Sequence, residues 1–301
     1  MRGILAPVPV VAAGGIRQNA AMGQEGEQLV IDVQGHALAA SLFRARESKT
    51  VVLVNSATAV PRQFYRYFAD YLRASGWSAL TYDYRGIGGS APGTLAGFDV
   101  RMRDWVLRDM SGVIDWVAAN LAPERLYCVG HSFGGQALGM VANPEAVRAA
   151  VGVSAQSGYW GVQGGAEKLR TGIAVHTLMP LFAKTLGYFP WSKLARGEDL
   201  PGGVALEWSR WCRNRNYLLD DETLPLDRYQ RFEAPLLAYS IEDDLWGTAR
   251  AVDEMMRAYS NVTRRHIVPA DYGFDALGHM GYFRRNSATL WDEAIAWLDA
   301  N

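Results

Sequence analysis

Residues 125–136 read RLYCVGHSFGGQ, with a single serine, Ser132, standing between glycines in the spacing G-x-S-x-G. The apolar residues before it are typical of a buried strand, and a helix is expected from Gln136 onward. A sharp strand-to-helix turn projects a serine hydroxyl clear of a sheet and requires small residues on both sides, here Gly130 and Gly134. Five-residue matches occur often by chance, so the alternative is one polar residue in a glycine-rich loop. The rest of the chain has to decide.

Strand and helix patterns alternate on both sides of this stretch. The apolar run TVVLVN at 50–55 is typical of a strand buried on both faces, and residues 104–120 carry an apolar stripe at helical spacing. Such alternation predicts an α/β protein with a mostly parallel central sheet flanked by helices. The expected strands are 29–33, 37–43, 50–55, 125–130, 149–155, 235–241 and 264–270, with another starting at 78, and the other expected helices are 62–74, 104–120, 248–259 and 287–299.

The alternation stops at residues 156–233, where aromatic residues and glycines become dense and no clear strand pattern remains. A structureless loop of this length would be unusual inside a compact domain, so a helical cap inserted between two late strands is expected. The chain therefore divides into a core of residues 28–155 and 234–301, the cap, and a flexible N-terminal extension at 1–27. Met22, within that extension, is an alternative natural start.

The composition is that of an ordinary soluble globular protein. The 301 residues are 49% hydrophobic and 20% charged with a formal net charge of −1, which gives no electrostatic reason to expect nucleic acid or an anionic membrane. No apolar run approaches the ~18 to 20 residues of a membrane span. Two cysteines, Cys128 and Cys212, are too few for a disulfide framework. These features predict a cytoplasmic protein, and no metal-ligand spacing or phosphate-binding loop indicates a cofactor.

Four segments, in their order along the chain, resemble the landmarks of the α/β-hydrolase superfamily. The resemblance spans about residues 28–300, and the cap region is similar to that of a group of bacterial predicted hydrolases without firmly assigned substrates. It is specific for the fold and the catalytic triad and weak for the substrate. The four segments are YDYRGIGGS at 82–90, VGHSFGG at 129–135, SIEDDLW at 240–246 and LGHMGYF at 277–283.

The resemblance implies a nucleophile, an acid after a later strand and a histidine near the C-terminus. Ser132 is then the nucleophile and His279 the base, because a serine hydroxyl needs a histidine to take its proton. The base needs a carboxylate to hold its tautomer, and the strand at 235–241 ends in two candidates. The family pattern favours Asp244, and Asp243 stays open as the alternative.

Two backbone N–H groups are expected to form an oxyanion hole. The turn places the N–H of Phe133 at the start of a helix, where it can face a developing negative charge. The family supplies the second donor from the loop after the strand at 50–55, and the resemblance implies the N–H of Ala57. Asn55 and Ser56 stand where many family members have His-Gly, which is a departure from the pattern.

The sequence thus predicts a serine hydrolase that forms an acyl-enzyme, most plausibly on a small-molecule carboxylic ester. An acyltransferase, a thioesterase or a peptidase would use the same triad. The competing class is a module of the same fold whose site is catalytically inactive and only binds a ligand, because fold does not establish function. Asp83 and Arg85, within the first landmark, are expected to tie loops together rather than to take part in chemistry.

Overall fold

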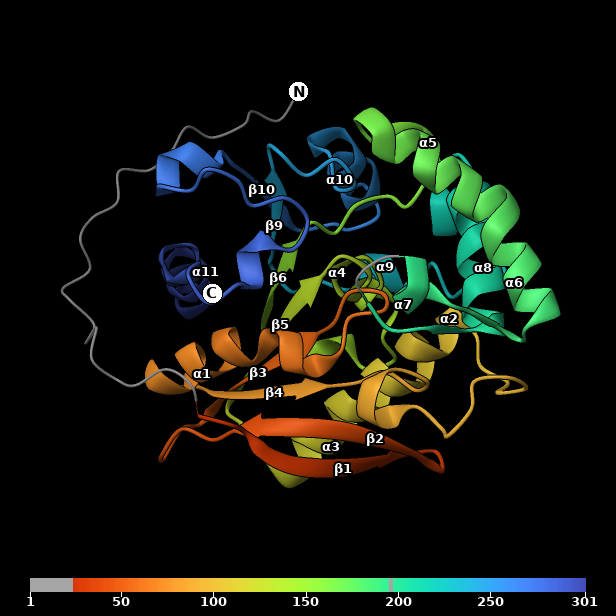
Figure 1. The fold of residues 1–301 in the computed structure, drawn as a ribbon. Helices are drawn as coiled ribbons and strands as arrows, with labels where there is room; N and C mark the ends of the chain where they lie inside the picture. The colour runs from red at the N-terminus through yellow and green to blue at the C-terminus, as the bar shows by residue number, and fades with distance from the viewer. Residues whose placement is uncertain (1–23, 195–196) are drawn as a thin grey trace.

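The computed structural model describes residues 24–194 and 197–301, so most of the N-terminal extension expected at 1–27 lies outside the described residues. Its central feature is an eight-stranded sheet in the order β1-β2-β4-β3-β5-β6-β9-β10 (Figure 1). All the predicted strands form, with small shifts at their ends. They are β1 Glu27–Val33, β2 His36–Phe43, β3 Thr50–Asn55, β4 Ser78–Tyr82, β5 Arg125–His131, β6 Ala149–Val153, β9 Leu236–Ile241 and β10 Val262–Ile267.

The sheet is parallel from β4 to β10 and carries an antiparallel hairpin at one edge. Strands β1 and β2 pair antiparallel, and β2 joins β4 in the same sense. The pairs β4–β3, β3–β5, β5–β6, β6–β9 and β9–β10 are all parallel. The carboxyl ends of the parallel strands therefore lie along one edge, which is where ligands bind in sheets of this kind.

Alternate residues of the central strands enter two hydrophobic clusters on opposite faces of the sheet. Val52 and Val54 join the cluster that holds α1 Arg66–Ala74 and α11 Ala288–Ala300, which lie together in Figure 1. Leu53 joins the cluster that holds α10 Ala249–Met256 and the long helical segment at 102–120. That burial on both faces explains why these strands read as continuous apolar runs.

The helical segment at 102–120 consists of α2 Met102–Asp104, a π-helical turn Trp105–Met110, and α3 Ser111–Asn120. Its predicted apolar stripe is confirmed, because every member of the stripe is buried in the core. The members are Val106, Met110, Val113, Ile114 and Val117.

The prediction that a helix starts at Gln136 is wrong. The structure has α4 at Phe133–Gln136 only, followed by a 3₁₀ turn at Leu138–Met140. Two of the four residues of α4 are glycine, a poor helix former. Pro144 disfavours helical backbone at the residue before it, so the segment ends as a series of short turns.

The segment between β6 and β9 is mostly helical, and two of its helices, Met179–Thr185 and Gly202–Arg213, lie side by side in Figure 1. We call residues 156–233 the insertion. A two-stranded ladder also occurs there, which the sequence did not reveal because each strand has only two residues. The elements of the insertion are α5 Gly165–Ile173, a π-helical turn Ala174–Leu178, α6 Met179–Thr185, β7 Tyr188–Phe189, α7 Trp191–Leu194, β8 Leu200–Pro201, α8 Gly202–Arg213 and α9 Arg228–Arg231.

A group of charged side chains joins the insertion to the core. Arg103 of α2 donates from Nε to Glu207 Oε1 at 2.6 Å and from Nη2 to Asp221 Oδ2 at 3.0 Å. The indole of Trp211 donates to the same Asp221 oxygen at 2.8 Å. Glu207 and Asp221 are buried, so each carboxylate depends on these donors in place of water.

Replacement of Arg103 should therefore destabilise the fold. Arg103→Met removes a donor from two buried carboxylates, and we expect the free energy of unfolding in urea to fall by about 2–4 kcal/mol. Arg44→Met is the matched control, because Arg44 faces Glu27 at 3.8 Å with both side chains more than half exposed. If both substitutions lower the free energy of unfolding by equal, small amounts, Arg103 does not stabilise the contact between the insertion and the core.

Candidate active site

Ser132 sits on a strained turn between β5 and α4. Its backbone has φ +50° and ψ −117°, a region that residues other than glycine rarely adopt. Such a conformation costs about 1–3 kcal/mol and persists only where the surroundings enforce it. One enforcing contact is the hydrogen bond from Ser132 N to Val153 O in β6, at 2.9 Å.

Glycines make room for this turn. A Cβ on Gly130 would lie 2.4 Å from the backbone nitrogen of Gly135, and one on Gly134 would lie 2.2 Å from the carbonyl oxygen of Asn55. Neither distance is possible for a real side chain, so only glycine fits at both positions. The turn is thereby pressed against the end of β3 as well as against its own helix, which is the crowding that the G-x-S-x-G spacing predicts.

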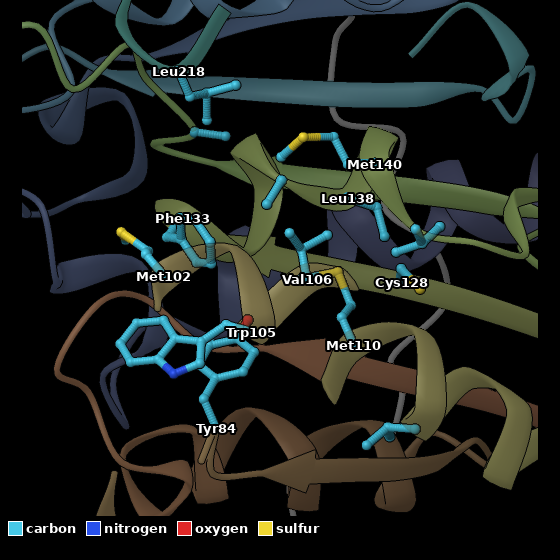
Figure 2. Packing of buried hydrophobic residues seen from close by; sticks show 14 of the residues in the cluster. Tyr84, Met102, Trp105, Val106, Met110, Cys128, Phe133, Leu138, Met140 and Leu218 are labelled. Atoms are coloured by element: carbon cyan, nitrogen blue, oxygen red, sulfur yellow. The ribbon is translucent and has the colours of Figure 1, made fainter. Parts of the chain in front are cut away.

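Phe133, the residue after the serine, anchors the turn in the core. Its ring meets Trp105 edge to face with centroids 5.8 Å apart, and Trp105 stacks on Tyr84 at 5.0 Å (Figure 2). Since Phe133 is the first residue of α4, its N–H has no acceptor one turn earlier in the helix. That N–H is therefore available to an anion beside Ser132.

His279 and Asp244 are hydrogen-bonded to each other. His279 Nδ1 lies 2.8 Å from Asp244 Oδ2, and Asp244 Oδ1 accepts the N–H groups of Trp246 and Gly247 at 2.9 and 2.8 Å. Burial by itself would raise the pKa of this carboxyl, but the His279 charge and the hydrogen bonds lower its pKa to about 2. The carboxylate therefore stays ionised across the neutral range, and it fixes the imidazole with Nδ1 protonated.

Asp243 has a different set of contacts. Its two oxygens accept the backbone N–H groups of Leu277 and Gly278, each at 2.9 Å. These are the two residues before His279, so Asp243 holds the loop while Asp244 holds the ring. Of the two carboxylates left open by the sequence, the structure brings Asp244 to the imidazole.

The serine hydroxyl donates to Gln156 Oε1 at 3.5 Å. Gln156 follows β6 and is buried. No local sequence pattern singles it out, because its proximity to Ser132 depends on the pairing of β5 with β6. The loop that carries His279 lies next to the serine turn, since the ring of His131 is centred 5.1 Å from the ring of His279. Catalytic hydrogen bonds are often long or misaligned until substrate binds.

The expected role of Ala57 as second oxyanion donor does not agree with its contacts. Its N–H donates to the hydroxyl of Tyr65 at 2.8 Å and is therefore already engaged in this structure. The sequence-based assignment rested on the position of the loop alone. It did not take into account Tyr65, eight residues further along, whose hydroxyl accepts this N–H.

The structural role predicted for Asp83 and Arg85 is confirmed. Asp83 accepts the N–H groups of Arg62 and Gly89 at 2.6 and 2.9 Å, and Arg85 Nε donates to Asp109 at 2.6 Å. Asp83, Arg85 and Asp109 are buried, so these bonds fasten the loops around β4 from inside the protein.

Membrane helices and metal clusters are typical of other protein classes. Among residues 24–194 and 197–301, no helix is long and apolar enough to cross a membrane. Over the same residues, no three His, Cys, Asp or Glu side chains are gathered as metal ligands would be. Both cysteines, Cys128 and Cys212, are free and buried.

Comparison with known families agrees with this geometry. The profile described as "Alpha/beta hydrolase family" matches residues 51–290, which include the serine turn, both carboxylates and His279. The chain belongs to the alpha/beta hydrolase family. Among curated protein sequences, none matches it.

Solved structures share the fold at low sequence identity. A soluble variant of monoglyceride lipase from Saccharomyces cerevisiae, in complex with a substrate analog, is 13% identical with a TM-score of 0.67, covering 98% of this chain and 99% of that chain. Est1E from Butyrivibrio proteoclasticus with ferulic acid bound is 16% identical with a TM-score of 0.59, covering 91% and 100%. At such identities the likeness shows the fold alone.

Exchange of each carboxylate for an amide should separate the two aspartates. Asp244→Asn keeps the shape but loses the charge that holds the imidazole, and we expect kcat on an ester to fall about 10⁴-fold. Asp243→Asn loses one acceptor for backbone N–H groups, so a far smaller loss is expected. Steady-state kinetics with p-nitrophenyl esters measure both. Equal, small losses would exclude both carboxylates from catalysis.

The lowered pKa of Asp244 also predicts a pH dependence of stability. A carboxyl whose pKa falls from 3.8 to about 2 on folding stabilises the protein above pH 3.8, and this contribution disappears as the pH falls through 2. We expect wild type to exceed Asp244→Asn in free energy of unfolding by about 2 kcal/mol at pH 5. Urea titrations from pH 5 to pH 2 should show that difference shrinking. A difference that grows toward low pH would contradict the assignment.

Proposed function

We propose that this protein is a serine hydrolase that cleaves carboxylic esters through an acyl-enzyme. Ser132 is the nucleophile, His279 the general base and acid, and Asp244 the carboxylate that orients His279. The observation that carries the proposal is the 2.8 Å hydrogen bond between Asp244 and His279, in a loop next to the strained serine turn. Family membership supports the same conclusion.

The reaction follows from the tautomer that Asp244 selects. With Nδ1 donating to Asp244, Nε2 of His279 is the basic nitrogen and takes the proton as Ser132 Oγ attacks the ester carbonyl carbon. The tetrahedral oxyanion accepts the N–H of Phe133. Collapse breaks the bond to the alcohol oxygen, which takes the proton from Nε2. Water then attacks the acyl-enzyme by the same route, and release of the acid restores Ser132.

Charge on Asp244 matters at the point where His279 becomes cationic. An ionised carboxylate 2.8 Å from Nδ1 stabilises the imidazolium in a site that excludes most water, where electrostatic interactions are stronger than in solvent. A neutral amide in its place would offer no such stabilisation, and it could hold the ring in the wrong tautomer.

We also propose that the insertion acts as a cap domain over this site. Its contacts support that role: Gly164 N donates to Leu245 O at 2.7 Å beside the acid, and Glu198 N donates to Ala59 O at 2.8 Å on the loop after β3. Gln156, its first residue, touches the serine hydroxyl. A segment in contact with three loops of the site can exclude water and shape the pocket for the acyl and alcohol groups.

A small-molecule ester is the substrate class that we favour. The structural relatives named above are a monoglyceride lipase with a substrate analog and Est1E with ferulic acid bound, and the first of these supports an ester as the substrate class. Two arginines of the insertion are ion-paired within the protein, Arg210 with Asp221 and Arg215 with Glu254, so these two give no argument for an acidic substrate.

A fluorophosphonate probe tests the proposal directly. Wild type should be labelled at Ser132, and Ser132→Ala should be neither labelled nor active, with kcat on p-nitrophenyl esters reduced by about 10⁴-fold or more. Ser75→Ala, at the end of α1, is the matched control and should behave as wild type.

The outcomes separate the alternatives. If thioesters or peptides of graded length are turned over faster than esters, the protein is a thioesterase or a peptidase. Acyl transfer to an added alcohol would identify a transferase. No labelling of folded wild type would reject catalysis and favour a ligand-binding module.

A further inference from the structure

A chain of three hydrogen bonds runs through the protein beside the serine turn. Ala57 N donates to Tyr65 Oη at 2.8 Å, Tyr65 Oη lies 3.0 Å from His131 Nδ1, and His131 Nε2 lies 2.9 Å from the carbonyl oxygen of His279. Tyr65 and His131 are both completely buried. The chain therefore links the loop after β3, the residue before the nucleophile, and the backbone of the base, without any solvent in between.

The direction of every bond in this chain is determined by its ends. A carbonyl oxygen only accepts, so His131 Nε2 must carry a proton and donate it to His279 O. A neutral imidazole then has Nδ1 as an acceptor, which requires the Tyr65 hydroxyl to donate to it. The same hydroxyl oxygen accepts the N–H of Ala57. All the polar groups are satisfied in this one arrangement, and no other neutral arrangement satisfies them.

His131 is held neutral. Burial, with a smaller contribution from the nearby His279, lowers the pKa of His131 to about 3. Neutrality is useful here, because the ring of His131 is centred 5.1 Å from the ring of His279. A cation at that distance would oppose the imidazolium that His279 forms when it takes the serine proton.

Rigid packing surrounds the chain. Phe283 lies edge to face on Tyr65 and tilted on His131, with ring centroids 5.0 Å apart in each case. Tyr65 belongs to the same apolar cluster as β3 and α11. Neither Tyr65 nor His131 can rotate away without opening a cavity, so the distances along this chain of hydrogen bonds are fixed.

We propose that Tyr65 and His131 are positioning residues that set the distance between the nucleophile and its base. His131 and Ser132 are consecutive, so the bond from His131 to His279 O ties the backbone of the base to that of the nucleophile. Through Tyr65, the same imidazole also ties in the loop that borders the serine turn at Asn55. The inference rests on the proposed triad, since it assigns how two of its members are held in register.

The magnitude follows from how steeply reactivity depends on geometry. A displacement of about 1 Å between reacting groups can reduce the rate about 10²-fold with little effect on substrate binding. Loss of a positioning bond should therefore lower kcat and leave KM nearly unchanged, whereas loss of ordinary core packing should lower thermal stability with kcat preserved.

Three substitutions test this with a matched control. Tyr65→Phe removes only the hydroxyl, and His131→Leu removes both of the bonds made by the imidazole. His131→Gln retains an amide N–H that can reach His279 O in place of Nε2. The control is Tyr282→Phe, a buried tyrosine of the same cluster whose hydroxyl donates to Leu290 O instead.

We expect kcat on a p-nitrophenyl ester to fall about 10- to 100-fold in Tyr65→Phe and at least as far in His131→Leu. His131→Gln should recover a substantial part of the loss seen in His131→Leu, and Tyr282→Phe should match wild type in kcat. KM should change less than about twofold throughout, because substrate contacts remain. If Tyr65→Phe and His131→Leu keep wild-type kcat and lose only melting temperature, the pair is core packing and the inference is overturned.

Imidazole ¹⁵N NMR provides a readout that needs no substrate. His131 should appear as the neutral Nε2–H tautomer from pH 5 to pH 8, and the His279 signals should change in His131→Leu and return toward wild type in His131→Gln. A His131 that titrates in this range overturns the inference whatever the activity. If wild type is unlabelled by fluorophosphonate while the His279 signals change in His131→Leu as expected, the hydrolase is rejected and the hydrogen-bonded link from His131 to His279 is retained.

Discussion

The backbone of Ser132 is the constraint on which the rest of the site depends. A non-glycine residue at φ +50° is destabilised by about 1–3 kcal/mol, so the surrounding fold has to impose that conformation. It does so from three directions: the N–H is bonded to β6, Phe133 is packed under Trp105, and Gly134 lies against the carbonyl of Asn55. The first and third of these contacts require β5 to be parallel to and in register with its neighbours β6 and β3.

Parallel pairing also explains why residues far apart in the chain meet here. Strands β3, β5, β6 and β9 all end at the same edge of the sheet. Asn55 is the last residue of β3, and the loops after β5, β6 and β9 carry Ser132, Gln156 and Asp244 in turn. No single loop contains all of these residues. The sheet brings four loop beginnings together, and the loop after β10 adds His279.

The sequence predicted this sheet and the order of Ser132, aspartate and His279, because strand periodicity and local turn chemistry are encoded in short stretches. It could not predict which way the N–H of Ala57 faces, since that depends on a hydroxyl carried by Tyr65 at the start of α1. The short α4 was missed for a related reason: Gln136 ends a buried helix of four residues, and the close contacts of its two glycines are not visible in a helical pattern. Local patterns therefore specify the elements, and side chains from distant elements specify the orientation of individual donors.

The two adjacent aspartates show how side chains from a distant element orient His279. Asp243 binds the backbone just before His279, which limits where the residue can lie, and Asp244 binds Nδ1, which limits how the ring can turn. Neither restraint can replace the other, because a fixed backbone still permits rotation about the side-chain torsions, and a held ring nitrogen still permits movement of the loop. Together they leave Nε2 as the ring nitrogen of His279 that can exchange a proton with a reacting group, and they do so from one dipeptide at the end of β9.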